Sequence, residues 1–280
     1  MRAAAGAPTA AGAVPRPRSD SMAAMTGATD STEASAGGSR SGAQAVERAL
    51  LLLRLFDADR LDWSISELAA ASGLSVSTTH RLAAALRAGG MLDQDPRTER
   101  YRLGGLAVAL GRRADTALGL PRLVPQLERL AALTGESVNL GMRSGHHMVV
   151  LHHVPSSHPL RFDQQTGMRV PVHVSAMGRA VLSRAADLVQ EVADLGELEV
   201  LNDRTRTGEA LVADLREVRA RGWAFNDEER EPGVRAIGVA LPPGAGVPDG
   251  GVAVQGPTVR LTDQRVAELG PEVAAFVARL

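Results

Sequence analysis

Residues 64–103 read SISELAAASGLSVSTTHRLAAALRAGGMLDQDPRTERYRL, and this stretch decides the fold of the N-terminal third of the chain. It predicts two short helices joined by a glycine turn and followed by two short extended arms. Small hydroxyl side chains open the second helix. The pattern is typical of a helix-turn-helix with a wing, a unit that reads DNA in the major groove.

Capping residues set the ends of both helices. Ser64 and Glu67 have the spacing of a capping box, which predicts a helix over residues 64–72. Gly73 suits the positive φ of the turn that follows. Ser75 then caps the second helix, which is expected to end at the next Gly-Gly pair.

The second helix has an inner and an outer face. The repeat on the inner face consists of Val76, Thr79, Leu82, Ala83 and Leu86. No acidic residue occurs between Ser75 and Gly90, which suits a phosphate-lined groove. A solvated helix face is the alternative interpretation, but the capped helix before it and the predicted wing after it favour contact with DNA.

The wing is predicted from the turn Asp95-Pro96-Arg97-Thr98, which separates the two extended arms. Arg97, Arg100 and Arg102 would lie on or near it. Thr79 occurs in the inner-face repeat and is also one of the candidates. The candidate DNA-binding residues are Ser75, Ser77, Thr78, Thr79, His80, Arg81, Arg97 and Arg100.

Composition excludes several classes of function. The chain has no Cys, which excludes disulfides, thiolate metal sites and cysteine nucleophiles. All 31 basic residues are Arg and are opposed by 32 acidic residues, so charge that favours DNA must be local and one copy should bind DNA weakly. No apolar run approaches the roughly 18 residues that a membrane span needs. We expect a cytoplasmic protein without membrane contact.

The first 43 residues are of low complexity and rich in Ala, Gly, Ser, Thr and Pro. They lack apolar periodicity, which predicts a disordered tail. The alternative is a start codon assigned too early, with the true start at Met22 or Met25. Order is expected from Gln44, where one face of an amphipathic helix is formed by Val46, Ala49, Leu50, Leu53 and Phe56.

The rest of the chain reads as α+β. Residues 106–116 predict a linker helix, and regularly spaced leucines predict a further helix that ends at Gly135. Alternating apolar residues then predict a hairpin about the Ser144-Gly145 turn. The further expected elements are a helix from about Ala176, a helix over 209–221, strands over 235–241 and 251–255, and a C-terminal amphipathic helix.

Five sequence blocks, in the right order, resemble the IclR (isocitrate lyase regulator) family of bacterial transcriptional regulators. They are AVERALLLL, GLSVSTTHRL, YRLGGLAVALG, GMRVPVHVSAMGRAVLS (residues 167–183) and EEREPGVRAIGVAL (residues 228–241). Each block alone is weak evidence, whereas the ordered set is specific. The resemblance implies a winged helix-turn-helix over 44–105, a linker helix over 106–118 and a GAF-like effector-binding domain over 119–280.

The resemblance also implies an effector pocket at the sheet edge. Carried over by motif, its residues are Ala176, Met177, Asn226, Ala236, Ala253 and Gln255. Family members that bind small acids tend to carry Asp, Cys and Ser at the last four positions, so the pocket here is expected to be less polar, which disfavours a ligand like glyoxylate or pyruvate. For Ala236 and Ala253, the alternative interpretation is that their side chains pack in the core. The implied partners are an operator in double-stranded DNA, an organic-acid or aromatic-catabolite effector, and further copies in a homodimer or homotetramer.

Five of the seven histidines lie between His146 and His158. A zinc site needs three or four converging ligands, and His152 and His153 should point to opposite faces of a strand, so we favour a solvated surface. The acidic run over residues 227–229 is likewise interpreted as solvated. No enzyme motif occurs, and we expect no cofactor, no metal and no catalytic residue. The alternatives are a ligand-converting enzyme or a protein-contact module that carries a winged helix.

Overall fold

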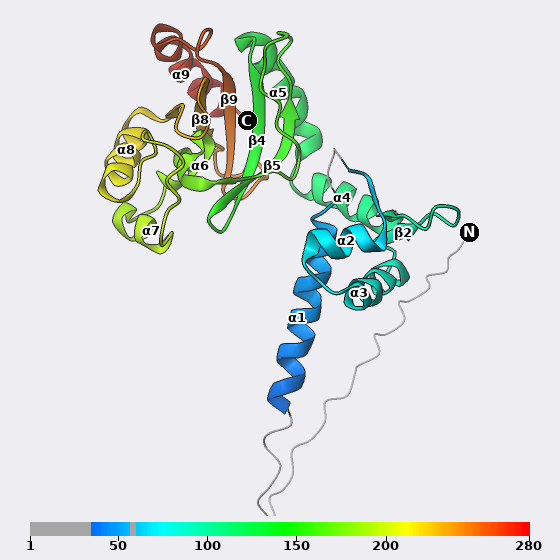
Figure 1. Cartoon of the computed structure of the whole chain (residues 1–280). Coiled ribbons are helices and arrows are strands. Elements are labelled where there is room, and N and C mark those ends of the chain that lie inside the picture. Colours follow the sequence, from blue (N-terminus) through cyan, green and yellow to red (C-terminus); the bar gives the residue numbers. More distant parts are fainter. Residues whose placement is uncertain (1–34, 57–59) are drawn as a thin grey trace, which may run out of the picture. The chain divides into compact units, whose positions relative to one another are not determined.

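The computed structural model describes residues 35–56 and 60–280 (Figure 1). The chain divides between Arg48 and Ala49 into two compact units. Helix α1 (Ser35–Leu53) begins before Gln44, because residues 35–43 contain no proline that would stop a helix. Residues 35–43, which were predicted to belong to a disordered tail, are therefore helical. The rest of the predicted tail, residues 1–34, lies outside the described residues and stays a prediction.

The second unit begins with a winged helix. Its elements are β1 (Asp62–Trp63), α2 (Ile65–Ser72), α3 (Val76–Ala88), β2 (Leu92–Gln94) and β3 (Tyr101–Leu103). The strands form an antiparallel sheet in the order β1-β3-β2. Its small core contains Leu52, Trp63, Leu68, Leu82, Ala83, Leu92 and Tyr101. Strand β1 was not predicted, because two residues are too few to show a period.

The predicted helix caps are confirmed. The Ser64 hydroxyl accepts a hydrogen bond from the Glu67 amide at 3.3 Å, and the Glu67 carboxylate accepts one from the Ser64 amide at 2.8 Å. Gly73 has a φ of 68°, and Ser75 caps α3. The assignment of Val76 to the inner face is wrong, because its side chain is 54% exposed and the buried stripe of α3 begins only at Thr79.

Helix α4 (Gly105–Ala117) follows the wing and has no buried side chain. The C-terminal domain has one antiparallel sheet in the order β6-β5-β4-β9-β8-β7. Its strands are β4 (Ser137–Ser144), β5 (His147–Val154), β6 (Arg169–Pro171), β7 (Ala224–Asp227), β8 (Val234–Ala240) and β9 (Gly250–Pro257). Helices cover both faces of this sheet (Figure 1).

The two faces of the sheet carry separate cores. Helices α5 (Leu120–Thr134) and α9 (Asp263–Val277) pack on one face, against side chains that include Val138, Leu140, Ile237 and Val254. On the other face lie α6 (Ala176–Leu182), α7 (Leu188–Asp194) and α8 (Gly208–Arg221), preceded by a 3₁₀ turn over Val172–Val174. Residues alternate between the faces along each strand, which is why two cores form.

Helix α6 approaches the sheet so closely that a glycine is needed beneath it. A Cβ atom on Gly238 of β8 would lie 2.1 Å from the carbonyl carbon of Ala176. Only a residue without a side chain permits this contact. Gly238 therefore sets the position of the N-terminal end of α6 against the sheet.

The predicted α+β class and the order of its main elements are confirmed. In the C-terminal domain, the unpredicted strands and α-helix are β6, β7 and α7, each of seven residues or fewer. None of the helices in the described part of the chain is long and apolar enough to cross a membrane.

Candidate DNA-binding surface and effector cavity

The N-terminal turn of α3 presents a small polar surface. The Ser75 hydroxyl caps the helix and donates to the Thr78 hydroxyl at 2.9 Å. Ser75, Ser77 and His80 are exposed, and Thr78 is half-buried. Hydroxyl groups and free amides at a helix N-terminus are suitable donors to phosphate oxygens.

Thr79 does not belong to that surface. Its side chain is fully buried, and its hydroxyl donates to the Ser75 carbonyl at 3.0 Å. The expectation that Thr79 contacts DNA is therefore wrong, because the helical repeat turns this residue into the core of the winged helix.

Two of the candidate arginines are free to meet an anion. Arg81 on α3 and Arg97 in the wing turn are exposed, and neither has an ion-pair partner within residues 35–56 and 60–280. The Asp95 carboxylate fixes the wing turn by accepting hydrogen bonds from the amides of Arg97 and Thr98, which lower the pKa of Asp95. The backbone of the turn is held while the Arg97 guanidinium stays available.

Arg100 has a different role from the one expected. Its Nε lies 2.6 Å from the Asp62 carboxylate and its Nη2 lies 2.9 Å from the Glu67 carboxylate. The hydrogen bond to Asp62 is the main reason why the pKa of Arg100 is raised. Arg102 is likewise paired with Asp93 at 2.8 Å. Arg100, which directly precedes β3, thus connects this strand to β1 and to the capping box of α2. The two carboxylates neutralise the charge of its guanidinium group.

The C-terminal domain contains a cavity between α6 and the sheet, and all six candidate effector residues line it. Its volume is about 30 Å³, room for about two water molecules. The candidates are Ala176, Met177, Asn226, Ala236, Ala253 and Gln255. The further lining residues are Gln164, Val170, Val174, Ser175, Arg230, Glu231 and Val234.

The register of the sheet explains why the candidates converge. Asn226 of β7 pairs with Ala236 of β8, which pairs with Gln255 of β9, so the three side chains form one row across the sheet. Ala253 lies two residues before Gln255 and therefore on the same face. Asn226 donates to the carbonyl of Val174 at 2.6 Å, which closes the row against the turn before α6.

A polar chain leads from the cavity to the segment between β5 and β6. The Asn139 amide donates to Gln255 Oε1 at 3.3 Å, and Asn139 Oδ1 lies 2.7 Å from His153 Nδ1. His153 Nε2 lies 3.2 Å from the Asp163 carboxylate. Desolvation raises the pKa of Asp163, but hydrogen bonds from Arg161 and His153 outweigh it, so this pKa is lowered. This series of polar contacts holds the connection between β5 and β6, which contains Gln164.

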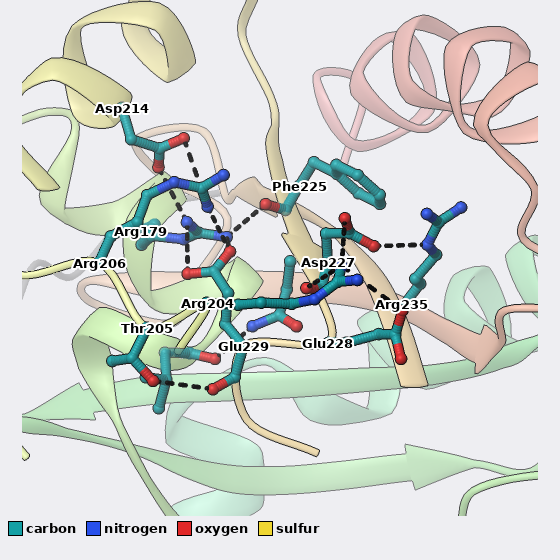
Figure 2. A network of polar contacts seen from close by, with 12 residues as sticks. Arg179, Arg204, Thr205, Arg206, Asp214, Phe225, Asp227, Glu228, Glu229 and Arg235 are labelled. Carbon is teal, nitrogen blue, oxygen red and sulfur yellow. Dashed lines mark hydrogen bonds and ion pairs between the residues drawn. The ribbon is translucent and has the colours of Figure 1, made fainter. Parts of the chain in front are cut away.

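A buried ionic network holds Glu229, the residue that directly precedes two cavity-lining residues (Figure 2). Arg179 of α6 is fully buried and binds Asp214 of α8 at 3.0 Å and Glu229 at 2.9 Å. Arg206 also binds Glu229, so two guanidinium groups face two carboxylates. The interpretation of residues 227–229 as a solvated run is wrong for Glu229, which is 1% exposed. Because Arg230 and Glu231 follow Glu229 directly, the network positions them at the cavity.

Sequence reasoning missed Gln164 and Arg230. Arg230 stands inside the block at residues 228–241, where a charged residue beside Glu229 was a usable signal. Gln164 belongs to no motif and reaches the cavity only through the fold of an irregular connection. For the histidine cluster, the described residues contain no group of three or more His, Asp or Glu side chains that could hold a metal ion.

Comparisons with known families cover most of the chain. Residues 121–280 match the family model for the C-terminal domain of the bacterial transcriptional regulator IclR. Residues 45–96 match the model of the IclR helix-turn-helix domain. The two matched ranges contain all six candidate effector residues and six of the eight candidate DNA-binding residues; Arg97 and Arg100 lie outside them.

Individual relatives agree with the family models. The transcriptional regulator BhcR of Paracoccus denitrificans (strain Pd 1222) is 34% identical over 236 residues, covering 83% of this chain and 84% of the relative. The transcriptional repressor IclR of Escherichia coli (strain K12) is 29% identical over 237 residues, covering 82% and 86%. An IclR homologue from Microbacterium hydrocarbonoxydans, solved in complex with 4-hydroxybenzoate, has a TM-score of 0.68 at 20% identity and covers 84% of this chain and 98% of the homologue.

Proposed function

Because the chain belongs to the IclR family of bacterial transcriptional regulators, it is a DNA-binding regulator of transcription, and we propose that a small organic acid in the cavity modulates its operator binding. The observation that carries this proposal is the convergence of six candidate positions from α6, β7, β8 and β9 on one cavity. Because the volume of this cavity is about 30 Å³, its lining must widen to admit an acid. Arg230 at the rim supplies a cation for a carboxylate, since its one hydrogen bond in the described chain is to the Met168 thioether.

The set of residues proposed to contact DNA is smaller than the set predicted from the sequence. They are Ser75, Ser77, Thr78, His80, Arg81 and Arg97, with Thr79 left out because it is buried and Arg100 because it is paired. We assign DNA binding to residues 44–105, a linking role to residues 106–118 and ligand binding to residues 119–280. The matched family ranges and the bounds of α4 support these limits.

We further propose that the protein acts as a homodimer or a homotetramer. Helix α4 exposes Leu106, Val108 and Leu110 and buries no side chain, and α1 exposes Val46 and Leu50. Leu106 and Leu110 are four residues apart and lie on one face of α4, while Val108 is exposed on another, and such exposed apolar residues on a linking helix suit a second copy of the same helix. Two copies would also supply two recognition helices for a near-palindromic operator.

The experiment is a titration of operator DNA. A fluorescent fragment from upstream of the gene is bound in the presence and absence of individual organic acids, 4-hydroxybenzoate among them. One acid is expected to change the operator affinity by about 5–150-fold, and the operator should change the affinity for that acid by the same factor. Selective DNA binding that no acid alters would contradict the modulation.

The relatives are regulators, and we propose that the C-terminal domain binds its ligand without converting it. Incubation of the protein with an acid that binds, followed by mass spectrometry of the acid, tests this. Recovery of the acid unchanged is expected, whereas a product formed at a rate proportional to protein concentration would favour the enzyme alternative. Because its partner is DNA, we propose the cytoplasm as its compartment.

A further inference from the structure

We infer that Gln164 is a specificity-determining residue of the cavity, and that its Oε1 accepts a hydrogen bond from a hydroxyl or N–H group of the effector. The inference rests on the proposed effector-binding role of the cavity and adds a chemical requirement to it. The ligand class is an organic acid that also carries a hydrogen-bond donor.

The observation that supports this inference is a buried hydrogen-bond acceptor without a donor. Gln164 is 8% exposed and lines the cavity, and its Oε1 has no hydrogen-bond partner in the described chain. A buried amide oxygen without a donor costs free energy, and nearly all such groups in folded proteins are paired. A donor that arrives with the ligand would remove that cost.

The segment that carries Gln164 is held against β5, which fixes where this side chain leaves the backbone. Asp163, the preceding residue, is bonded to His153, and Arg161 Nε donates to the same carboxylate at 3.0 Å. On the other side of Gln164, the Gly167 amide donates to the Val150 carbonyl at 2.7 Å, and the Val150 amide donates to the Met168 carbonyl at 2.9 Å. The residue is thus fastened to β5 from both sides.

The other polar groups in the lining do not meet the same need. Gln255 Oε1 is occupied by the Asn139 amide, and the Asn226 amide is occupied by the Val174 carbonyl. Arg230 is a donor, and Glu231 is exposed to solvent. Gln164 is therefore the lining residue whose buried acceptor most requires a donor, while Arg230 offers a partner for the carboxylate.

The test compares acids that differ by one hydroxyl group. Calorimetry measures the binding of 4-hydroxybenzoate and benzoate, 3-hydroxybutyrate and butyrate, and lactate and propionate to the full chain. The variants are Gln164→Met, which keeps length and volume without the amide, and Gln165→Met. Gln165 is the neighbouring glutamine outside the cavity lining and serves as the matched control.

In the wild type, the hydroxylated acid of at least one pair should bind about tenfold more tightly than its partner, because the partner leaves the acceptor unpaired. Gln164→Met should reduce this ratio to about one, and Gln165→Met should preserve it. Without ligand, the melting temperature of Gln164→Met should be equal to or higher than that of the wild type, because the variant removes an unpaired polar group.

Several outcomes would overturn the inference. Equal binding within every pair, or a ratio that survives in Gln164→Met, would show that acids enter the cavity without using this acceptor, and the proposed function would stand. A clear drop in melting temperature for Gln164→Met alone would mean that Oε1 already has a partner. If no acid of either kind binds, the proposed effector role fails together with the inference.

Discussion

Arg81 and Arg100 are separated by 19 positions in the sequence and differ in what their guanidinium groups contact. Arg100 is held by Asp62 and Glu67, whereas Arg81 is exposed without an ion-pair partner in the described chain. At the residue scale, DNA binding therefore depends on which cations the fold leaves unpaired. A phosphate or a guanine edge can be met by Arg81, whereas Arg100 would first have to break two ion pairs.

We predict that Arg81→Ala weakens operator binding by about 1–3 kcal/mol, roughly 5-fold to 150-fold. Fluorescence anisotropy at several salt concentrations measures the affinity and its salt slope, which should fall if Arg81 contacts a phosphate. The matched control is Arg87→Ala on the same helix, where Arg87 is bonded to Gln94 at 3.1 Å. Equal losses for both variants would contradict a specific contact by Arg81.

Glu67 makes the winged helix sensitive to acid. Hydrogen bonds from Ser64, together with Arg100 and Arg60, lower the pKa of Glu67 from 4.5 to about 2. A carboxyl with a depressed pKa in the folded state contributes stability above its unfolded value of about 4.5, and this contribution is lost as the pH falls towards 2. Glu67→Gln should therefore be less stable than the wild type at pH 7, and the gap should narrow in thermal melts below pH 4.5.

The control for this pH series is Glu268→Gln, which removes an exposed carboxylate on α9. It should change the melting temperature little, because exposed ion pairs contribute little to stability. A gap between the wild type and Glu67→Gln that stays constant from pH 7 to pH 3 would count against the role of the ionised carboxylate.

At the scale of elements, the cavity depends on how closely α6 lies on β8. The Cα of Gly238 sits under the backbone of Ala176, with no room for a methyl group. Gly238→Ala should push α6 outwards and cost about 1–3 kcal/mol of stability. Urea unfolding measures the loss, and Gly105→Ala, at a site with nothing within 4 Å, is the matched control. If the two variants are equally stable, the contact does not constrain α6.

At the scale of the whole molecule, the proposed oligomer makes regulation depend on contacts between copies of the chain. We predict that Val108→Glu on α4 shifts the protein towards the monomer and weakens operator binding, because it replaces an exposed apolar side chain of this helix with a charge. Sedimentation velocity gives the oligomeric state. Val259→Glu introduces the same charge at a residue that is 74% exposed and should leave assembly unchanged. An unaltered sedimentation coefficient for Val108→Glu would argue against α4 as the interface.

The sequence by itself determined the features that depend on neighbours along the chain. The capping box at Ser64, the positive φ at Gly73 and the polar start of α3 follow from local hydrogen bonds and backbone sterics, so their residues were found without coordinates. The six cavity positions were also predicted, but only because the resemblance to a known family implies them.

The tertiary structure alone decided which of the candidate side chains are available and what surrounds the cavity. Thr79 turned inwards, and Arg100 met partners 33 and 38 positions away. Glu229 is buried in an ion pair with Arg179, 50 positions away in the sequence. Gln164 reaches the cavity on an irregular connection whose sequence shows no periodicity. These outcomes depend on packing between distant segments, which local propensity does not encode, and they separate the residues that bind from those that hold the fold.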